Sequence, residues 1–133
     1  MGTFTMVDDE CIIEICTPDR TTNRDDAFPL TLRRTMLHEL GHCWADAYAD
    51  DQAKGAFLEL RGLQCWSCDT AWEDKGCEHA AEIMEWGTID TPGLCRVLPN
   101  DCASLASAFQ TLTGKTPIRR SFDCSDEPID YFE

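Results

Sequence analysis

The chain has 133 residues, of which 25 are acidic and 11 are basic, so its formal net charge is −14. This length indicates a single domain over residues 1–133 with a modest core. The negative charge disfavours nucleic acid and anionic membrane surfaces, which would repel the chain, and no stretch is long and apolar enough for membrane insertion.

The first half of the chain predicts one strand and one long helix. Residues 10–17 (ECIIEICT) are rich in β-branched side chains and predict a strand, and a polar loop follows. A helix opens around Pro29, with Thr31 as a plausible N-cap. Its apolar positions recur at helical spacing and we expect them to face the core: Leu32, Met36, Leu40, Cys43 and Ala47.

The middle of the chain predicts two further helices. Residues 51–61 (DQAKGAFLELR) form the first of them. Residues 77–87 (CEHAAEIMEWG) form the next, which begins near Asp74 and ends at Gly87. A segment rich in cysteine and tryptophan connects the two.

A fourth helix is predicted at residues 101–114, with Asn100 or Asp101 as its N-cap. Its apolar face comprises Leu105, Phe109 and Leu112. We expect residues 1–9 and 121–133 to fray, unless Cys124 ties the second segment down. The predicted fold class is therefore mainly α (α+β), with about four helices and a short strand or small sheet.

The predicted long helix contains the motif H-E-x-x-H, which runs from His38 through Glu39 to His42. Residues four positions apart lie one turn apart on a helix, so both imidazoles can reach one ion. Glu39 is placed to take a proton from a metal-bound water. The competing interpretation is a histidine pair without metal. Both histidines lie away from the predicted apolar stripe, and this position favours a metal site over a histidine pair without metal.

Three segments together resemble a group of small HExxH metalloproteases of actinobacterial and phage type: RRTMLHELGHCWADAY, CEHAAEIMEWG and CASLASAFQTLTGKTP. The resemblance covers about residues 30–118. It implies a minimal zincin-like peptidase domain of the gluzincin kind, in which a glutamate on a second helix is the third zinc ligand. Glu78 matches that ligand. Glu82, four positions later, matches the acidic residue that orients a ligand histidine, here His38.

Other third ligands remain open. A one-turn slip would make Glu82 the ligand, and His79 is a further candidate because histidine is a common zinc ligand. Asp46 follows His42 by four positions, but Ala45 and Tyr48 replace the glycine and the final ligand of the aspartate-type pattern. The metzincin pattern fails for the same reason.

Nine cysteines are a high number for this length and favour up to four disulfides with one thiol left over. We therefore expect a secreted or cell-envelope protein, although residues 1–10 show no apolar segment typical of a signal peptide, and a cytoplasmic location is the alternative. Cys43 is a candidate for a buried disulfide partner or for the free thiol. A second, structural zinc site is also conceivable, with ligands Cys65, Cys68, Cys77 and His79.

The sequence thus predicts a monomeric zinc-dependent peptidase that acts on a protein or peptide substrate. His38, His42 and Glu78 would hold Zn²⁺ and Glu39 would activate water. The resemblance further implies that a strand, here residues 10–17, holds an extended substrate. No motif names the oxyanion-stabilising group, for which Tyr48, Arg61 and Arg96 are candidates. The alternative function is a disulfide-stapled zinc-binding interaction module or inhibitor without activity.

Overall fold

The computed structural model describes residues 2–15, 28–88, 95–118, 124–125 and 127–128, except for the side chains of residues 28–31. In chain order the elements are β1 (Gly2–Val7), β2 (Glu10–Ile15), α1 (Phe28–Tyr48), α2 (Asp51–Arg61), a short 3-10 helix η1 (Trp72–Asp74), α3 (Gly76–Thr88) and α4 (Cys102–Thr113). The predicted fold class, mainly α with a small sheet, is confirmed.

The two strands form an antiparallel hairpin whose register runs from Gly2 opposite Ile15 to Val7 opposite Glu10. Its two-residue turn, Asp8–Asp9, has φ angles of 49° and 66°. Positive φ at both turn residues suits the twist of paired strands, and aspartate tolerates this conformation. The expectation that residues 1–9 fray is therefore wrong for residues 2–7. The predicted strand at 10–17 is β2, and residues 16 and 17 lie outside the described part.

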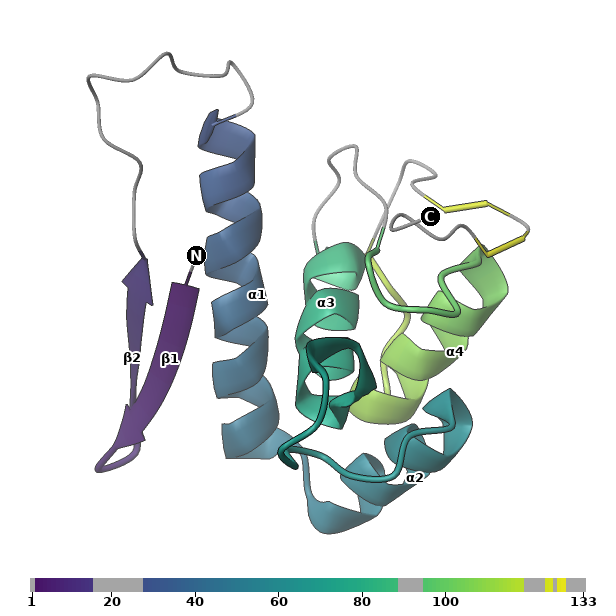
Figure 1. Ribbon diagram of the computed structural model, residues 1–133, viewed down its shortest axis with the longest axis horizontal. Helices are drawn as coiled ribbons and strands as arrows, with labels where there is room; N and C mark the ends of the chain where they lie inside the picture. The colour runs from purple at the N-terminus through teal and green to yellow at the C-terminus, as the bar shows by residue number, and fades with distance from the viewer. Residues whose placement is uncertain (1, 16–27, 89–94, 119–123, 126, 129–133) are drawn as a thin grey trace.

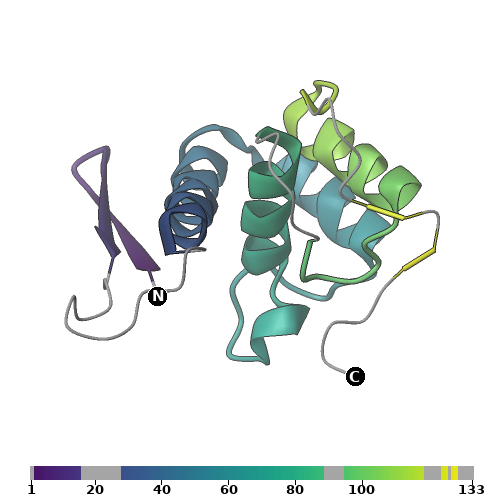
Figure 2. The ribbon, with the colours of Figure 1, turned by 90° about the horizontal axis from the view of Figure 1, so that it is seen from above.

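Helix α1 lies between the hairpin and α3 (Figures 1 and 2). The expectation for its buried face is confirmed for Cys43 but wrong for Met36 and Leu40, which are 45% and 48% exposed, and for Ala47, which is also exposed. The side facing α3 is instead lined by small residues and by the two histidines: His38, Gly41, His42 and Ala45. Hydrophobic periodicity gives little weight to Gly and Ala, yet small residues let two helices approach closely. The helix also begins at Phe28, so Thr31 is not its N-cap.

Helix α3 is central and packs against α1, α2 and α4 (Figure 1). Phe57, Ile83 and Leu105 are fully buried between these helices. The predicted apolar face of α4 is confirmed, because Leu105, Phe109 and Leu112 are all buried.

The ends of α2 and α4 follow from their capping residues. The side chains of Asp50 and Asp101 accept hydrogen bonds from the backbone N–H groups of Ala53 and Ser104. Gly62 and Gly114 end the helices with φ angles of 68° and 71°, in the left-handed region that glycine adopts most readily. The range predicted for α2 is confirmed, and that for α4 is confirmed to within one residue at each end.

Three cysteine pairs lie at disulfide distance: Cys11–Cys43, Cys65–Cys68 and Cys102–Cys124. Cys43 is thus a buried disulfide partner and not the free thiol. Among the described cysteines, Cys77 and Cys95 are unpaired. Cys16 lies outside the described residues, as do residues 119–123, 126 and 129–133 of the C-terminal segment. No helix in the described part of the chain has both the length and the apolar character needed to cross a membrane.

Candidate metal centre

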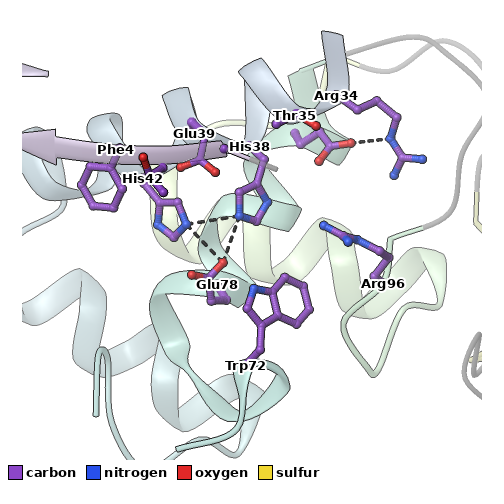
Figure 3. A pocket seen from close by; sticks show the side chains of 12 residues that line it. Phe4, Arg34, Thr35, His38, Glu39, His42, Trp72, Glu78 and Arg96 are labelled. Atoms are coloured by element: carbon purple, nitrogen blue, oxygen red, sulfur yellow. Dashed lines mark hydrogen bonds and ion pairs between the residues drawn. The ribbon is translucent and has the colours of Figure 1, made fainter. Parts of the chain in front are cut away.

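Two helices bring three potential ligand atoms together. His38 and His42 lie one turn apart on α1, are both buried, and have their Nε2 atoms 3.2 Å apart. Glu78, in the first turn of α3, places Oε2 2.9 Å from His38 Nε2 and 3.2 Å from His42 Nε2 (Figure 3). The structure therefore brings the three residues predicted as ligands to one point.

These atoms fit the geometry of a divalent ion. Ligands at about 2.1 Å from a tetrahedral zinc ion lie about 3.4 Å from one another, and the three observed distances are 2.9, 3.2 and 3.2 Å. A set of two imidazole nitrogens and one carboxylate oxygen is also chemically suited to zinc. The group could hold a metal ion.

Glu82 lies beside Nδ1 of His38, whereas Glu78 lies beside Nε2. The Glu82 Oε1 atom lies 3.1 Å from His38 Nδ1, and Arg96 Nε donates a hydrogen bond of 3.0 Å to the same carboxylate. When a metal ion is bound, a proton on Nδ1, on the side of Glu82, would leave the lone pair of Nε2 directed at the ligand point. This is the orienting position predicted for Glu82.

The alternative third ligands do not reach both histidines. Glu82 approaches only Nδ1 of His38; it also belongs to a second group of close potential ligands, with His38 and Glu85. His79 Nδ1 accepts a hydrogen bond from Arg61 Nε, and its Nε2 lies 2.6 Å from the Glu73 carbonyl oxygen, to which it donates. Both ring nitrogens of His79 are thus engaged away from the site.

Two further metal hypotheses are not supported by the described residues. Cys65 and Cys68 pair with each other, and His79 is engaged elsewhere, so the proposed Cys₃His site does not assemble. Asp46 is exposed on α1 and does not line the pocket around the histidines.

In the metal-free protein, contacts among His38, Glu78 and Glu82 shift the pKa values of all three side chains. Burial lowers the pKa of His38, but hydrogen bonds and charge interactions with Glu78 and Glu82 outweigh burial and raise this pKa to about 9. Burial raises the pKa of Glu78, but its contacts with His38 and His42 hold it well below its ordinary value. Burial also raises the pKa of Glu82, but contacts with His38 and Arg96 lower it to about 2.

The ligand point opens into a pocket of about 710 Å³. Glu39, the predicted proton acceptor, is buried, and its side chain lines this pocket next to the histidines (Figure 3). Phe4 of β1 stacks on the His42 ring at 4.7 Å between ring centroids, and Trp72 of η1 stacks on the His38 ring at 6.2 Å. The pocket thus has an aromatic wall behind each imidazole.

The strand that borders the pocket is β1. Gly2, Thr3 and Phe4 line it, whereas no residue of the predicted strand at 10–17 does so among those described. The N-terminal strand was missed, although Phe4 and Met6 alternate with Thr3 and Thr5, and Asp8–Asp9 is a recognisable turn. The pocket also contains Arg34 and Thr35, which the sequence did not indicate. It further contains Glu85, which continues the helical face of Glu78 and Glu82, and Trp72, one of four tryptophans that the sequence assigns to the core more often than to a cleft.

Of the three candidates for oxyanion stabilisation, one lies at the pocket. Tyr48 is 75% exposed and lies outside it, and Arg61 is bonded to His79 and to the Pro99 carbonyl oxygen. Arg96 lines the pocket, with its guanidinium group 5.0 Å from the centroid of the Trp72 ring.

Comparisons with known proteins return no match: a scan against models of protein families, a search of curated proteins and a search of solved structures each find none. The resemblance to gluzincin-type metalloproteases therefore stays a prediction from the motifs.

Proposed function

We propose that this protein is a zinc-dependent peptidase of the gluzincin type. The observation that carries the proposal is the convergence of His38, His42 and Glu78 within 3.2 Å of one another, in a pocket that Glu39 also lines. Such an arrangement of two histidines and a carboxylate, with a further carboxylate beside an open pocket, is typical of catalytic zinc sites.

Charge also supports a cation at this point. Four carboxylates, two guanidinium groups and two histidines gather around the ligand point: Glu39, Glu78, Glu82, Glu85, Arg34, Arg96, His38 and His42. With neutral histidines, two negative charges are uncompensated, and one divalent ion would neutralise them. Without a metal, protonation of His38 supplies part of this charge, in line with its raised pKa.

Each side chain would have a separate role in the reaction. Zinc, when bound by His38, His42 and Glu78, would supply Lewis acidity toward a peptide carbonyl and a water molecule. A Glu39 carboxylate oxygen would accept a proton from the water as the water oxygen bonds to the carbonyl carbon, and would then pass that proton to the amide nitrogen as the C–N bond breaks. Glu82 holds the His38 ring in the orientation that keeps Nε2 available.

We further propose a secreted or cell-envelope location for this activity. Three cysteine pairs at disulfide distance are compatible with an oxidising environment, in which disulfides persist. Protein or peptide substrates would be reached there by a monomeric enzyme.

The decisive experiment measures bound zinc and peptide cleavage for the wild type and for three variants. Glu39→Gln is expected to keep zinc and to lose cleavage by at least about a hundredfold, because the proton acceptor is gone. Glu78→Gln is expected to lose zinc affinity and cleavage together. Glu59→Gln, an exposed position on α2, is the matched control and should change neither.

Each outcome discriminates between functions. Zinc bound by the wild type without cleavage of any peptide in a broad library would favour the disulfide-stapled zinc-binding module or inhibitor. Failure of the wild type to bind zinc would exclude both the peptidase and the zinc-binding module or inhibitor. Undiminished cleavage by Glu39→Gln would exclude the proposed mechanism.

A further inference from the structure

We propose that one end of the pocket, formed by Arg34 and Arg96 and called the arginine end below, binds a carboxylate group of the substrate. This inference rests on the proposed peptidase function, because it names the class of peptide that the same pocket prefers. The two side chains come from different parts of the chain, α1 and the segment before α4.

The arginine end lies on a defined side of the metal centre. Figure 3 shows both guanidinium groups beyond His38, on the side away from Phe4. Arg34 precedes His38 by four residues on α1, which corresponds to about one helical turn, or roughly 5–6 Å along the helix axis. An extended peptide rises about 3.4 Å per residue, so a group bound there lies one or two residues from the bond at the metal.

Both guanidinium groups are held in place by buried carboxylates. Arg34 Nε donates to Glu85, and Arg96 donates to Glu82 and lies over the Trp72 ring. The side chains of Glu85 and Glu82 are only 4% and 1% exposed. A guanidinium group that is already ordered loses less conformational entropy when it binds a ligand.

The same guanidinium groups remain accessible from the pocket. The side chains of Arg34 and Arg96 are 28% and 48% exposed, and both line the pocket. Planar guanidinium groups bind carboxylates through paired hydrogen bonds that are stronger than neutral ones. Once a bound divalent ion offsets the two uncompensated negative charges of the centre, two arginines at one end of the pocket favour an anionic substrate group. That group is either an Asp or Glu side chain or the C-terminal carboxylate of a peptide.

The test measures binding by calorimetry, with zinc-loaded Glu39→Gln protein so that no peptide is cleaved. The reference is a neutral peptide with an amidated C-terminus. A second set of peptides carries Glu within two residues of the central bond, at each position in turn, and a third set ends in a free carboxylate at the same distances. We expect at least one acid-bearing peptide to bind about tenfold more tightly than the reference, and its identity distinguishes the side chain from the C-terminus.

Variants in the same Glu39→Gln background assign the preference to the arginine end. The double variant Arg34→Gln/Glu85→Gln removes the guanidinium group together with the buried carboxylate to which its Nε donates, so Glu85 is not left as an unpaired buried charge. Its preference for the acidic peptide should fall to within about twofold, with zinc content unchanged. Arg33→Gln removes the neighbouring charge, which is exposed and outside the pocket, and should keep the full preference.

A single variant covers the case in which the double variant does not fold. Arg34→Lys keeps the charge but loses the planar pair of donors, so it should lower the preference several-fold. Equal binding of acidic and neutral peptides, binding of none of them, or a preference that survives loss of Arg34 would overturn the inference.

Cleavage by the wild type is recorded in parallel with the same peptides. Cleavage without acidic preference means that the peptidase function stands and the inference fails. Acidic preference in binding without any cleavage means that the arginine end binds carboxylates and the peptidase function fails.

Discussion

His38 is the residue on which the chemistry of the metal-free centre depends. It lies between Glu78, 2.9 Å from Nε2, and Glu82, 3.1 Å from Nδ1. These two carboxylates outweigh the effect of burial and raise the pKa of His38 from 6.5 to about 9. In the metal-free protein at neutral pH, the Nε2 atom therefore carries a proton where a metal ion would bind.

Metal binding should consequently release a proton from His38. Because the metal competes with this proton, zinc affinity should rise by about tenfold per pH unit from pH 6.5 toward pH 9, the pKa of His38 in the metal-free protein. Calorimetric titration in buffers of different ionisation enthalpy measures the number of protons released. Competition with a chelator at each pH measures the affinity.

A matched variant tests whether His38 is the source of that proton. Glu82→Gln removes one of the two carboxylates that raise the pKa of His38, so the pH dependence should become shallower above neutrality. Zinc affinity that is constant from pH 6.5 to 8.5 in the wild type would contradict the assigned protonation state.

At this scale the sequence predicted which three potential ligand residues lie together. The spacing of His38 and His42 needs only a helix to bring them together, and that helix is present. Glu78 was predicted only from the resemblance to a known family, because spacing along the chain does not tell which face of α3 meets α1. Arg34 carried no recognisable signal, since its place in the pocket depends on how separate elements pack.

At the scale of elements, the centre depends on how closely α1 and α3 approach. A Cβ atom at Gly41 would lie 3.1 Å from both Ala81 Cα and Met84 Cβ. Gly41 lies between His38 and His42, so any separation of the helices here would move the two histidines away from Glu78. The hydrophobic stripe of α1 pointed to the opposite face, because it weighed Met36 and Leu40 above glycine and alanine.

We therefore expect Gly41→Ala to destabilise the protein by about 1–3 kcal/mol, as overpacking does, and to weaken zinc binding as well. Gly55→Ala on α2 is the matched control, because its Cβ would meet nothing within 4 Å. That control should stabilise the protein by about 0.5–1 kcal/mol through helix propensity and leave zinc affinity unchanged. Chemical denaturation and zinc titration measure both effects. If Gly41→Ala binds zinc like the wild type, the close crossing does not position the ligands.

At the scale of the whole molecule, two disulfide pairs attach peripheral segments to different places. Cys11–Cys43 joins the hairpin to α1, where Phe4 stacks on His42 and Gly2 lies against Glu39. Cys102–Cys124 joins the C-terminal segment to the start of α4, and neither cysteine lines the pocket. The sequence predicted a high disulfide content from nine cysteines, but it could not predict the pairing, which depends on the fold.

Paired serine variants separate the contributions of these two disulfides. The pairs span 32 and 22 positions of the chain, so loop-closure entropy assigns each about 3–4 kcal/mol of stability. Cys11→Ser/Cys43→Ser and Cys102→Ser/Cys124→Ser should therefore lose similar stability in chemical denaturation. Only the first removes the covalent link between β2 and α1 and so loosens the hairpin that carries β1. Under conditions in which both variants remain folded, only the first should lose most of its peptide cleavage while it keeps zinc. Equal cleavage by the two variants would show that the hairpin is not part of the working site.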